Sequence, residues 1–300
     1  MFDAIVWFLS NVVAGFMNLA KVIFNPSVWP NPSDMESVAR FAYYGASVEF
    51  FFIIFDLAVV LLIIGIWRRH VLWGFVRASE KINNTIGRIA AWAVLIMVLQ
   101  QVIIVALQRI FRVSEITIAP FGFGFTKDVS WYAEELKLYN AIVVALCAAY
   151  TFIQGGHVRV DLIYSIVSFR KQKIIDMAGS LFFALPFLTI VWLYGWFFLW
   201  RHLVRPPLAS NFDLERVVRT SKALKWDVET IGFSPNGFDG YFLFKVLLVS
   251  FAGLMFLQAL TFFYRSLLEY IEGEESRDRY LDKDSDQEAD AIAKTAGHGA

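Results

Sequence analysis

The chain has 300 residues, 58% of them hydrophobic, and a formal net charge of zero. Its mean hydropathy is +0.55, and its apolar residues form runs of about 20, the length that carries a helix across a bilayer. This composition excludes an ordinary soluble domain and offers no basic surface for nucleic acid. We therefore predict an all-α integral membrane protein that is surrounded by the lipid bilayer.

Residues 2–24 form the first apolar segment, and polar residues interrupt it along one helical face. The segment either crosses the membrane with this stripe facing a neighbouring helix, or lies in the interface. The stripe consists of Asp3, Ser10, Asn11, Asn18 and Lys21. A proline-rich loop follows over residues 25–33.

Residues 43–67 form a clear membrane span that contains two acidic residues. Glu49 and Asp56 are seven positions apart, which places them on one face of a helix. A carboxyl inside a span is costly and usually faces protein or water. The pair is either a coupling or substrate site, or a set of protonated or hydrogen-bonded packing contacts.

The next segments are a polar connection over residues 71–88 and a span over residues 89–110, which closes with Arg109. After a loop, Ser130 is expected to cap a helix whose first turn contains Glu134 and Glu135, because acids there complement the helix dipole.

Glycines stop this helix at Gly155, since glycine commonly follows the last helical turn. Four further segments are expected, in chain order: a short interfacial helix at 162–169 capped by Asp161, a span at 174–200 kinked at Pro186, a polar loop at 201–240, and a span at 241–264.

Lysine and arginine set the predicted orientation. Residues 67–88 carry five of these bases and residues 154–175 carry four, so the positive-inside rule places both segments in the cytoplasm. The acidic C-terminal tail, residues 269–300, then also faces inward, and we expect it to be disordered. The loop at 201–240 faces outward, although its six basic residues run against the rule.

The sequence shows no catalytic or redox motif. None of the four histidines lies in the middle of a span, which argues against haem, and the single Cys147 excludes an intrachain disulfide. No zinc-protease, nucleotide-binding or serine-hydrolase pattern is present. We therefore expect no cofactor, no metal site and no enzymatic activity.

The most specific pattern is the run Gly156-His157-Val158-Arg159-Val160-Asp161 at the exit of a span. In an extended segment, His157, Arg159 and Asp161 point one way and the two valines the other. The valines would face the membrane boundary. The charged residues either position the following interfacial helix or contact a partner subunit.

With this pattern, residues 89–264 resemble the small membrane subunit (Q, or DctQ-like) of tripartite ATP-independent periplasmic (TRAP) transporters. Further features carry the resemblance: Arg109 at a span end, Trp131 followed by Glu134 and Glu135, and a last span that opens with Lys245 and contains Gln258.

The resemblance implies a non-enzymatic, four-helix subunit in the bacterial inner membrane. Its partners would be a large membrane subunit, which carries the substrate and ion sites, and a periplasmic solute-binding protein. The solutes would be organic acids or similar compounds. The chain would then divide into an N-terminal extension with one or two further spans (1–80), the four-helix domain (81–268) and the tail (269–300).

Two other functions remain open from the sequence. The chain is an autonomous transporter or channel that uses Glu49 and Asp56, or it is a sensor or assembly protein that uses the additional N-terminal spans.

Overall fold

Helices dominate the computed structural model, which describes residues 2–26, 29–118, 125–155, 167–205, 207, 213–224, 238, 240–277 and 279–281. Six helices of the described chain are long and apolar enough to cross a membrane. The coarse fold prediction, an all-α protein of the multi-pass membrane type, is therefore borne out.

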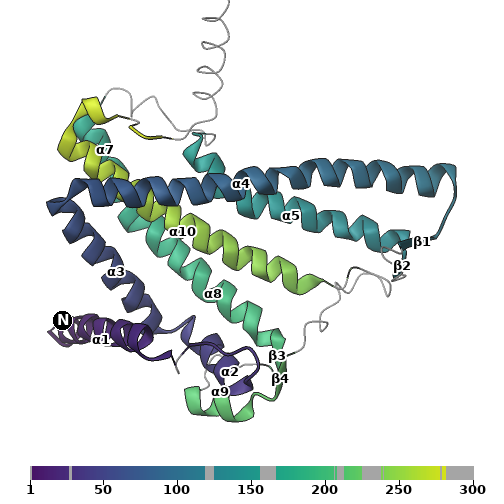
Figure 1. The fold of residues 1–300 in the computed structure, drawn as a ribbon, viewed down its shortest axis with the longest axis horizontal. Coiled ribbons are helices and arrows are strands. Elements are labelled where there is room, and N and C mark those ends of the chain that lie inside the picture. The colour runs from purple at the N-terminus through teal and green to yellow at the C-terminus, as the bar shows by residue number, and fades with distance from the viewer. Residues whose placement is uncertain are drawn as a thin grey trace, which may run out of the picture. The chain divides into compact units, whose positions relative to one another are not determined.

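The helices in chain order (Figure 1) are α1 (Phe2–Phe24), α2 (Met35–Tyr44), α3 (Val48–Trp67), α4 (Arg69–Val105), α5 (Val129–Ile153), α7 (Phe169–Gly179), α8 (Leu185–Leu203), α9 (Leu214–Thr220) and α10 (Tyr241–Glu272). Two short antiparallel pairs accompany them, β1 (Glu115–Ile118) with β2 (Phe125–Asp128) and β3 (Val204–Arg205) with β4 (Ala223–Leu224).

The chain forms two compact units. Unit 1 contains residues 1–72 and 189–249, and unit 2 contains residues 73–188 and 250–300. The N-terminal residues therefore pack with a later part of the chain, and the units do not follow the boundaries that the sequence suggested.

In unit 1, α1 packs on α3 through Gly15, the one buried residue of α1. A Cβ at Gly15 would overlap Oδ2 of Asp56, so the glycine allows the two helices to approach closely. The rings of Phe8 and Phe52 meet edge to face at 5.4 Å beside this contact. From the polar stripe, Asn11 and Asn18 are half-buried, whereas Asp3, Ser10 and Lys21 are exposed.

Unit 1 also joins α2 to α8. The indole Nε1 groups of Trp192 and Trp196 donate to the carbonyl oxygens of Gly45 and Ala42 at 2.8 and 2.9 Å. These carbonyls lie at the C-terminal end of α2, where a helix leaves backbone acceptors without partners of its own. α9, within the predicted loop 201–240, packs against α2.

In unit 2, the predicted polar connection at 71–88 is helical, because α4 runs without a break from Arg69. The segment has no proline, and Ser79, Glu80, Asn83 and Asn84 are buried on one side of the helix, whereas Arg77, Lys81 and Thr85 on the other side are exposed. α4 packs on α5 where Gly87 lies against the ring and Cβ of Tyr150.

The start of α5 differs from the sequence prediction, and its end agrees with it. α5 begins at Val129, so Ser130 is not its cap, and Glu134 and Glu135 lie beyond its first turn. The predicted stop at Gly155 is confirmed, since this residue has a φ of 73° just after the helix.

The irregularity expected at Pro186 takes the form of a π-helical turn over Ser180–Ala184 between α7 and α8. A proline cannot donate the backbone hydrogen bond of a regular helix, and a wider turn accommodates this loss.

Two glycines of α4 provide a matched test of the packing in unit 2. Gly87→Ala places a methyl group on Tyr150 and should destabilise the protein by about 1–3 kcal/mol. Gly74→Ala meets nothing within 4 Å and should leave stability unchanged or raise it by about 0.5–1 kcal/mol through helix propensity. Thermal unfolding in detergent measures both, and equal effects of the two changes would contradict the packing described here.

Candidate functional site

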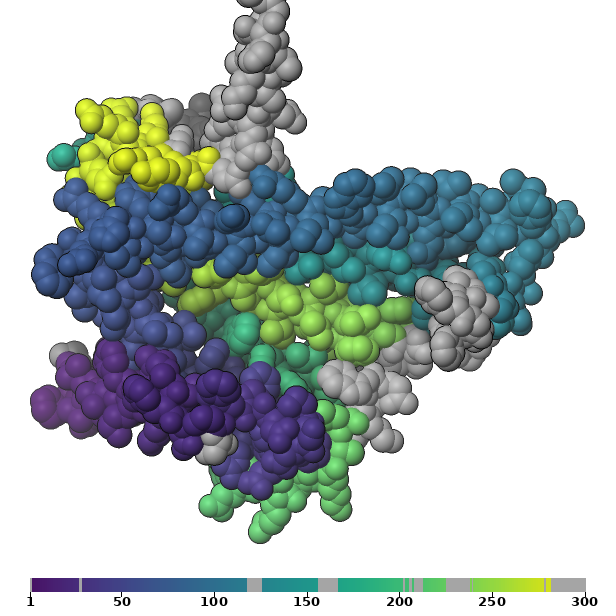
Figure 2. All heavy atoms as spheres, viewed as in Figure 1, coloured from purple at the N-terminus to yellow at the C-terminus, as the bar shows by residue number. Residues whose placement is uncertain are grey.

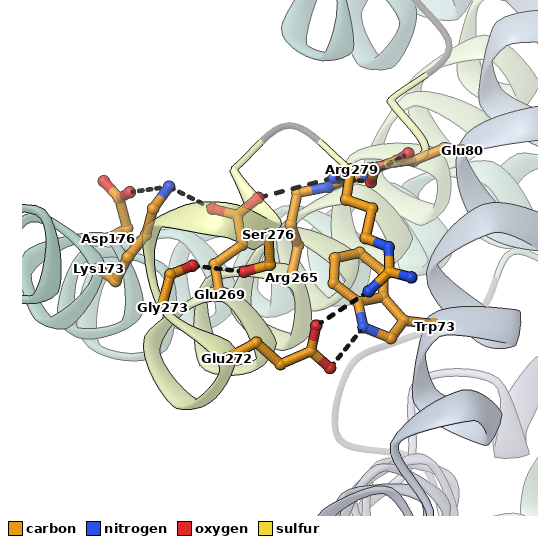
Figure 3. A network of polar contacts seen from close by, with 10 residues as sticks. All are labelled: Trp73, Glu80, Lys173, Asp176, Arg265, Glu269, Glu272, Gly273, Ser276 and Arg279. Atoms are coloured by element: carbon orange, nitrogen blue, oxygen red, sulfur yellow. Dashed lines mark hydrogen bonds and ion pairs between the residues drawn. The ribbon is translucent and has the colours of Figure 1, made fainter.

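A buried network of charged side chains connects α4, α7 and the end of α10 within unit 2 (Figure 3). Its starting point is the sequence of α10, where Arg265, Glu269 and Glu272 follow at helical spacings of four and three. These spacings place the three side chains on one face of the helix.

The centre of the network is a two-pronged ion pair between α10 and α4. Arg265 donates from Nε and Nη2 to the two carboxylate oxygens of Glu80, at 2.9 and 2.6 Å. Both side chains are at least 93% buried. A planar guanidinium matches a carboxylate in this geometry, which gives a strong and directional interaction.

α7 joins through Lys173, whose Nζ lies 2.6 Å from Oε2 of Glu269 and 3.7 Å from Oδ2 of Asp176. Glu269 is 1% exposed, and its other oxygen lies 3.7 Å from Nη1 of Arg265. Glu269 therefore connects the cation of α7 to the central pair.

The residues after α10 fold back and complete the network. Nη1 of Arg265 donates to the backbone carbonyl of Arg279 at 2.9 Å. Glu272 accepts from the indole N–H of Trp73 at 3.1 Å, and its second oxygen lies 3.5 Å from Nη1 of Arg279. The indole of Trp73 also lies 5.5 Å below the guanidinium of Arg265, a favourable cation–π arrangement.

A second polar layer lies further along the same helices. Nδ2 of Asn83 donates to Oε1 of Gln258 at 2.8 Å between α4 and α10. Thr261 is fully buried nearby in sequence and donates to its own helix backbone. Gln258, one of the residues that carry the family resemblance, therefore joins α10 to α4 by a buried hydrogen bond.

We call this network the clamp; its charged members are Glu80, Lys173, Asp176, Arg265, Glu269, Glu272 and Arg279. Three cations face four carboxylates, and each charge has an opposite charge within 4 Å. Such groups are held in place and are not poised to attack or protonate a substrate. Removing one member would leave its partner charged and buried, which is much more costly than losing an exposed pair.

The predicted residues on α5 also lie in unit 2. Trp131 is buried, with the ammonium of Lys127 5.6 Å from its ring centre. Glu135 accepts from Gln100 at 3.1 Å and from the Tyr139 hydroxyl at 3.2 Å. Glu135 thereby connects α5 to α4.

Glu134 is half-buried beside this contact, and Arg109 is exposed in a π-helical turn at the end of α4. Among the described residues, no hydrogen bond or ion pair joins Arg109 to α5. The residues of the predicted motif, Gly156, His157, Arg159 and Asp161, lie outside the described residues.

The two acids of α3 are in different environments. Asp56 is 1% exposed, and neither carboxylate oxygen has a hydrogen-bond partner among the described residues. Glu49 is exposed in the first turn of α3. The structure does not bring them together as one site.

Sequence reasoning missed the members of the clamp. Glu269 was assigned to a disordered tail, but it is buried in α10, which continues to Glu272; the described residues up to Tyr280 take part in contacts. The signal was present in the spacing of charges on α10, where an apolar span continues into a helix with a charged face.

The described residues bring together no group of three histidine, cysteine or acidic side chains that could hold a metal ion. A comparison of the chain with models of known protein families finds no match, and comparisons with curated proteins and with solved structures find none either.

The central ion pair can be tested against an exposed one. Glu80→Gln leaves Arg265 charged and buried, and should destabilise the protein by roughly 3–5 kcal/mol. Glu36→Gln breaks the exposed pair with Arg40 on α2 and should cost less than about 1 kcal/mol. Thermal unfolding compares the two.

A double variant separates pairing from general disruption. Glu80→Leu combined with Arg265→Met removes both charges and should recover much of the stability lost by Glu80→Gln. Glu80→Leu and Arg265→Met are also measured singly. If the loss of stability in the double variant equals the sum of these two single losses, the pair is not the interaction that stabilises this site.

Proposed function

We propose that the chain is the small membrane subunit of a TRAP-type secondary transporter, where it supports a large transport subunit during ion-coupled uptake of an organic acid. The carrying observation is the clamp, in which Glu80, Lys173 and Arg265 hold three helices of unit 2 in one arrangement. A supporting subunit needs such a fixed frame, whereas a moving transport element needs interfaces that change.

The clamp also fits the proposed orientation. It joins α4 near Glu80, α7 near Lys173 and the end of α10, which belong to the three segments that the charge distribution assigns to the cytoplasm. The proposal places the clamp at the cytoplasmic end of unit 2 and the β1–β2 hairpin at the opposite end of α4.

The surface of α4 supports a role in assembly. Figure 2 shows one side of this helix uncovered along its length, and Trp92, Val98 and Val102 are at least 50% exposed. An apolar side of this kind packs on lipid or on the helices of another membrane protein. The proposal assigns part of it to the large subunit.

The proposal predicts copurification. The tagged chain, taken from its native membrane in mild detergent, should bring along a much larger multi-span membrane protein that mass spectrometry identifies. Arg159→Ala or Asp161→Asn should lower the amount of this partner and the rate of uptake without changing which solute is transported. Lys171→Ala, an exposed residue of α7, is the control.

A lone, monodisperse chain would refute the proposed assembly. A change of solute preference in the Arg159 or Asp161 variants would contradict a purely supporting role for these residues.

The alternative, an autonomous transporter, is favoured by one observation, the buried and unpartnered carboxyl of Asp56 among the described residues. The two functions differ in what Asp56→Asn does. In the supporting role, the complex with this variant should transport at close to the original rate, since asparagine keeps the shape of the contact with Gly15. In the autonomous role, vesicles that contain only this chain should show uptake, and Asp56→Asn should abolish it. Glu49→Gln in the same vesicles tests the other acid of this alternative, and a loss of uptake there as well would mean that both Glu49 and Asp56 are used.

A further inference from the structure

The corner between α3 and α4, which belongs to unit 1, carries three consecutive basic residues. Arg68 is the single residue between the two helices, and Arg69 and His70 begin α4. All three are exposed, and none of their side chains has a hydrogen bond or an ion pair among the described residues. Residues 57–79 contain no acid that could neutralise them locally. The corner therefore presents its positive charge outward.

The backbone of this corner is closely held. A Cβ at Gly65 would overlap the side chain of Leu72, so the glycine allows α4 to start close to α3. The backbone N–H of Arg68 donates to the carbonyl of Ile64 at 2.7 Å, and the N–H of Val71 donates to the carbonyl of Arg68 at 3.0 Å. Because only one residue separates the helices, the backbone sets the spacing of the three bases.

Apolar side chains lie exposed directly before the bases. Ile63, Ile66 and Trp67 occupy the last turn of α3, and they are 61%, 57% and 86% exposed. The 20 residues of α3 are about 30 Å long, which is the thickness of the hydrocarbon core, so Trp67 lies at its boundary. Indole rings favour this level of a membrane. The corner thus joins apolar surface at the membrane boundary to cations immediately outside it.

An anionic phospholipid matches both parts of this surface. Its acyl chain requires apolar surface, and its phosphate requires cations just outside the hydrocarbon core. A guanidinium fits the oxygens of a phosphate in a two-pronged geometry, and each base near the membrane surface strengthens the attraction to anionic lipids. A zwitterionic phospholipid has no net charge and gains less from the bases, and a soluble anion gains nothing from the apolar side chains.

We propose that the corner between α3 and α4 binds an anionic phospholipid of the surrounding leaflet. Its phosphate lies against Arg68 and Arg69, and one acyl chain runs along Ile63 and Ile66 beside the ring of Trp67. The bound lipid fixes this end of α3 at the membrane surface. The inference depends on α3 crossing the membrane and not on the proposed transporter role.

Photolabelling tests the preference for an anionic lipid. The full-length protein is placed in phosphatidylcholine nanodiscs with a small amount of a probe lipid that carries a diazirine near the glycerol end of one acyl chain. The probe is either a phosphatidylglycerol or a phosphatidylcholine. After illumination, mass spectrometry should find residues 63–67 labelled about 10- to 30-fold more by the phosphatidylglycerol probe. In about 1 M salt, which screens exposed charges, this preference should largely disappear.

Variants test whether the two arginines cause the preference. Arg68→Gln combined with Arg69→Gln should lower labelling by the phosphatidylglycerol probe to the level of the phosphatidylcholine probe. Arg68→Lys combined with Arg69→Lys keeps both charges and should keep most of the preference. Arg109→Gln removes an exposed base about 60 Å further along, just after α4, and should have no effect.

Three results would overturn the proposal. One is equal labelling of residues 63–67 by the two probes, and another is a preference that survives the paired glutamine changes or high salt. The third is loss of the phosphatidylglycerol label when inorganic phosphate replaces chloride at equal ionic strength, which would mean that the bases bind a soluble anion. Thermal unfolding confirms that each variant is folded, and the salt series on the unchanged chain decides the matter if the glutamine variant is not.

Discussion

The ion pair between Arg265 and Glu80 is the constraint on which unit 2 depends. Both charges are more than nine-tenths buried, and a buried charge is stable only while it stays paired. Neither side chain can return to water without separating α10 from α4. The pair therefore fixes the register of the two helices. Lys173 extends the same constraint to α7 through Glu269.

Burial of charge explains the contacts that the described residues after α10 make with the clamp. Arg265 has more donors than Glu80 can satisfy, and the backbone carbonyl of Arg279 takes one of them. Glu272, Trp73 and Tyr280 then enclose the network with a hydrogen bond and ring contacts. The acids that looked like the start of a solvated tail instead neutralise cations inside the protein.

The sequence predicts the spans well because their signal is local. Apolar runs of sufficient length mark each long helix, and Gly155 marks the end of α5 by a backbone conformation that other residues rarely adopt. Glu80 could not be assigned in this way. Its segment has the polarity of a solvated connection, and its partner lies 185 residues later in the chain.

The candidate site residues show the same difference between local sequence patterns and contacts with distant segments. Glu135 was expected as an acid of the first helical turn, but it lies beyond that turn and instead accepts from Tyr139 of its own helix and from Gln100 of α4. Asp56 and Glu49 share a helix face by spacing, but only the contact of Asp56 with Gly15 on α1 distinguishes the buried acid from the exposed one. Spacing within one helix does not say which neighbour covers it.

The two units are held together by different interactions. The polar clamp joins helices of unit 2 through paired charges, and in unit 1 Trp192 and Trp196 of α8 join α2 through two indole N–H donors. In both units, a helix from the N-terminal part of the chain is held by hydrogen bonds to a helix from the C-terminal part.

Hydrogen–deuterium exchange of the protein in nanodiscs tests the central claim most directly. If the clamp is a fixed frame, the amides around Glu80 on α4 and from Arg265 to Glu272 on α10 should exchange among the slowest of the chain, although they lie near helix ends. On the proposed function, their exchange should also stay unchanged when the solute and the coupling ion are added to the complex with the large subunit. Fast exchange in these segments, or exchange that rises during transport, would contradict the account.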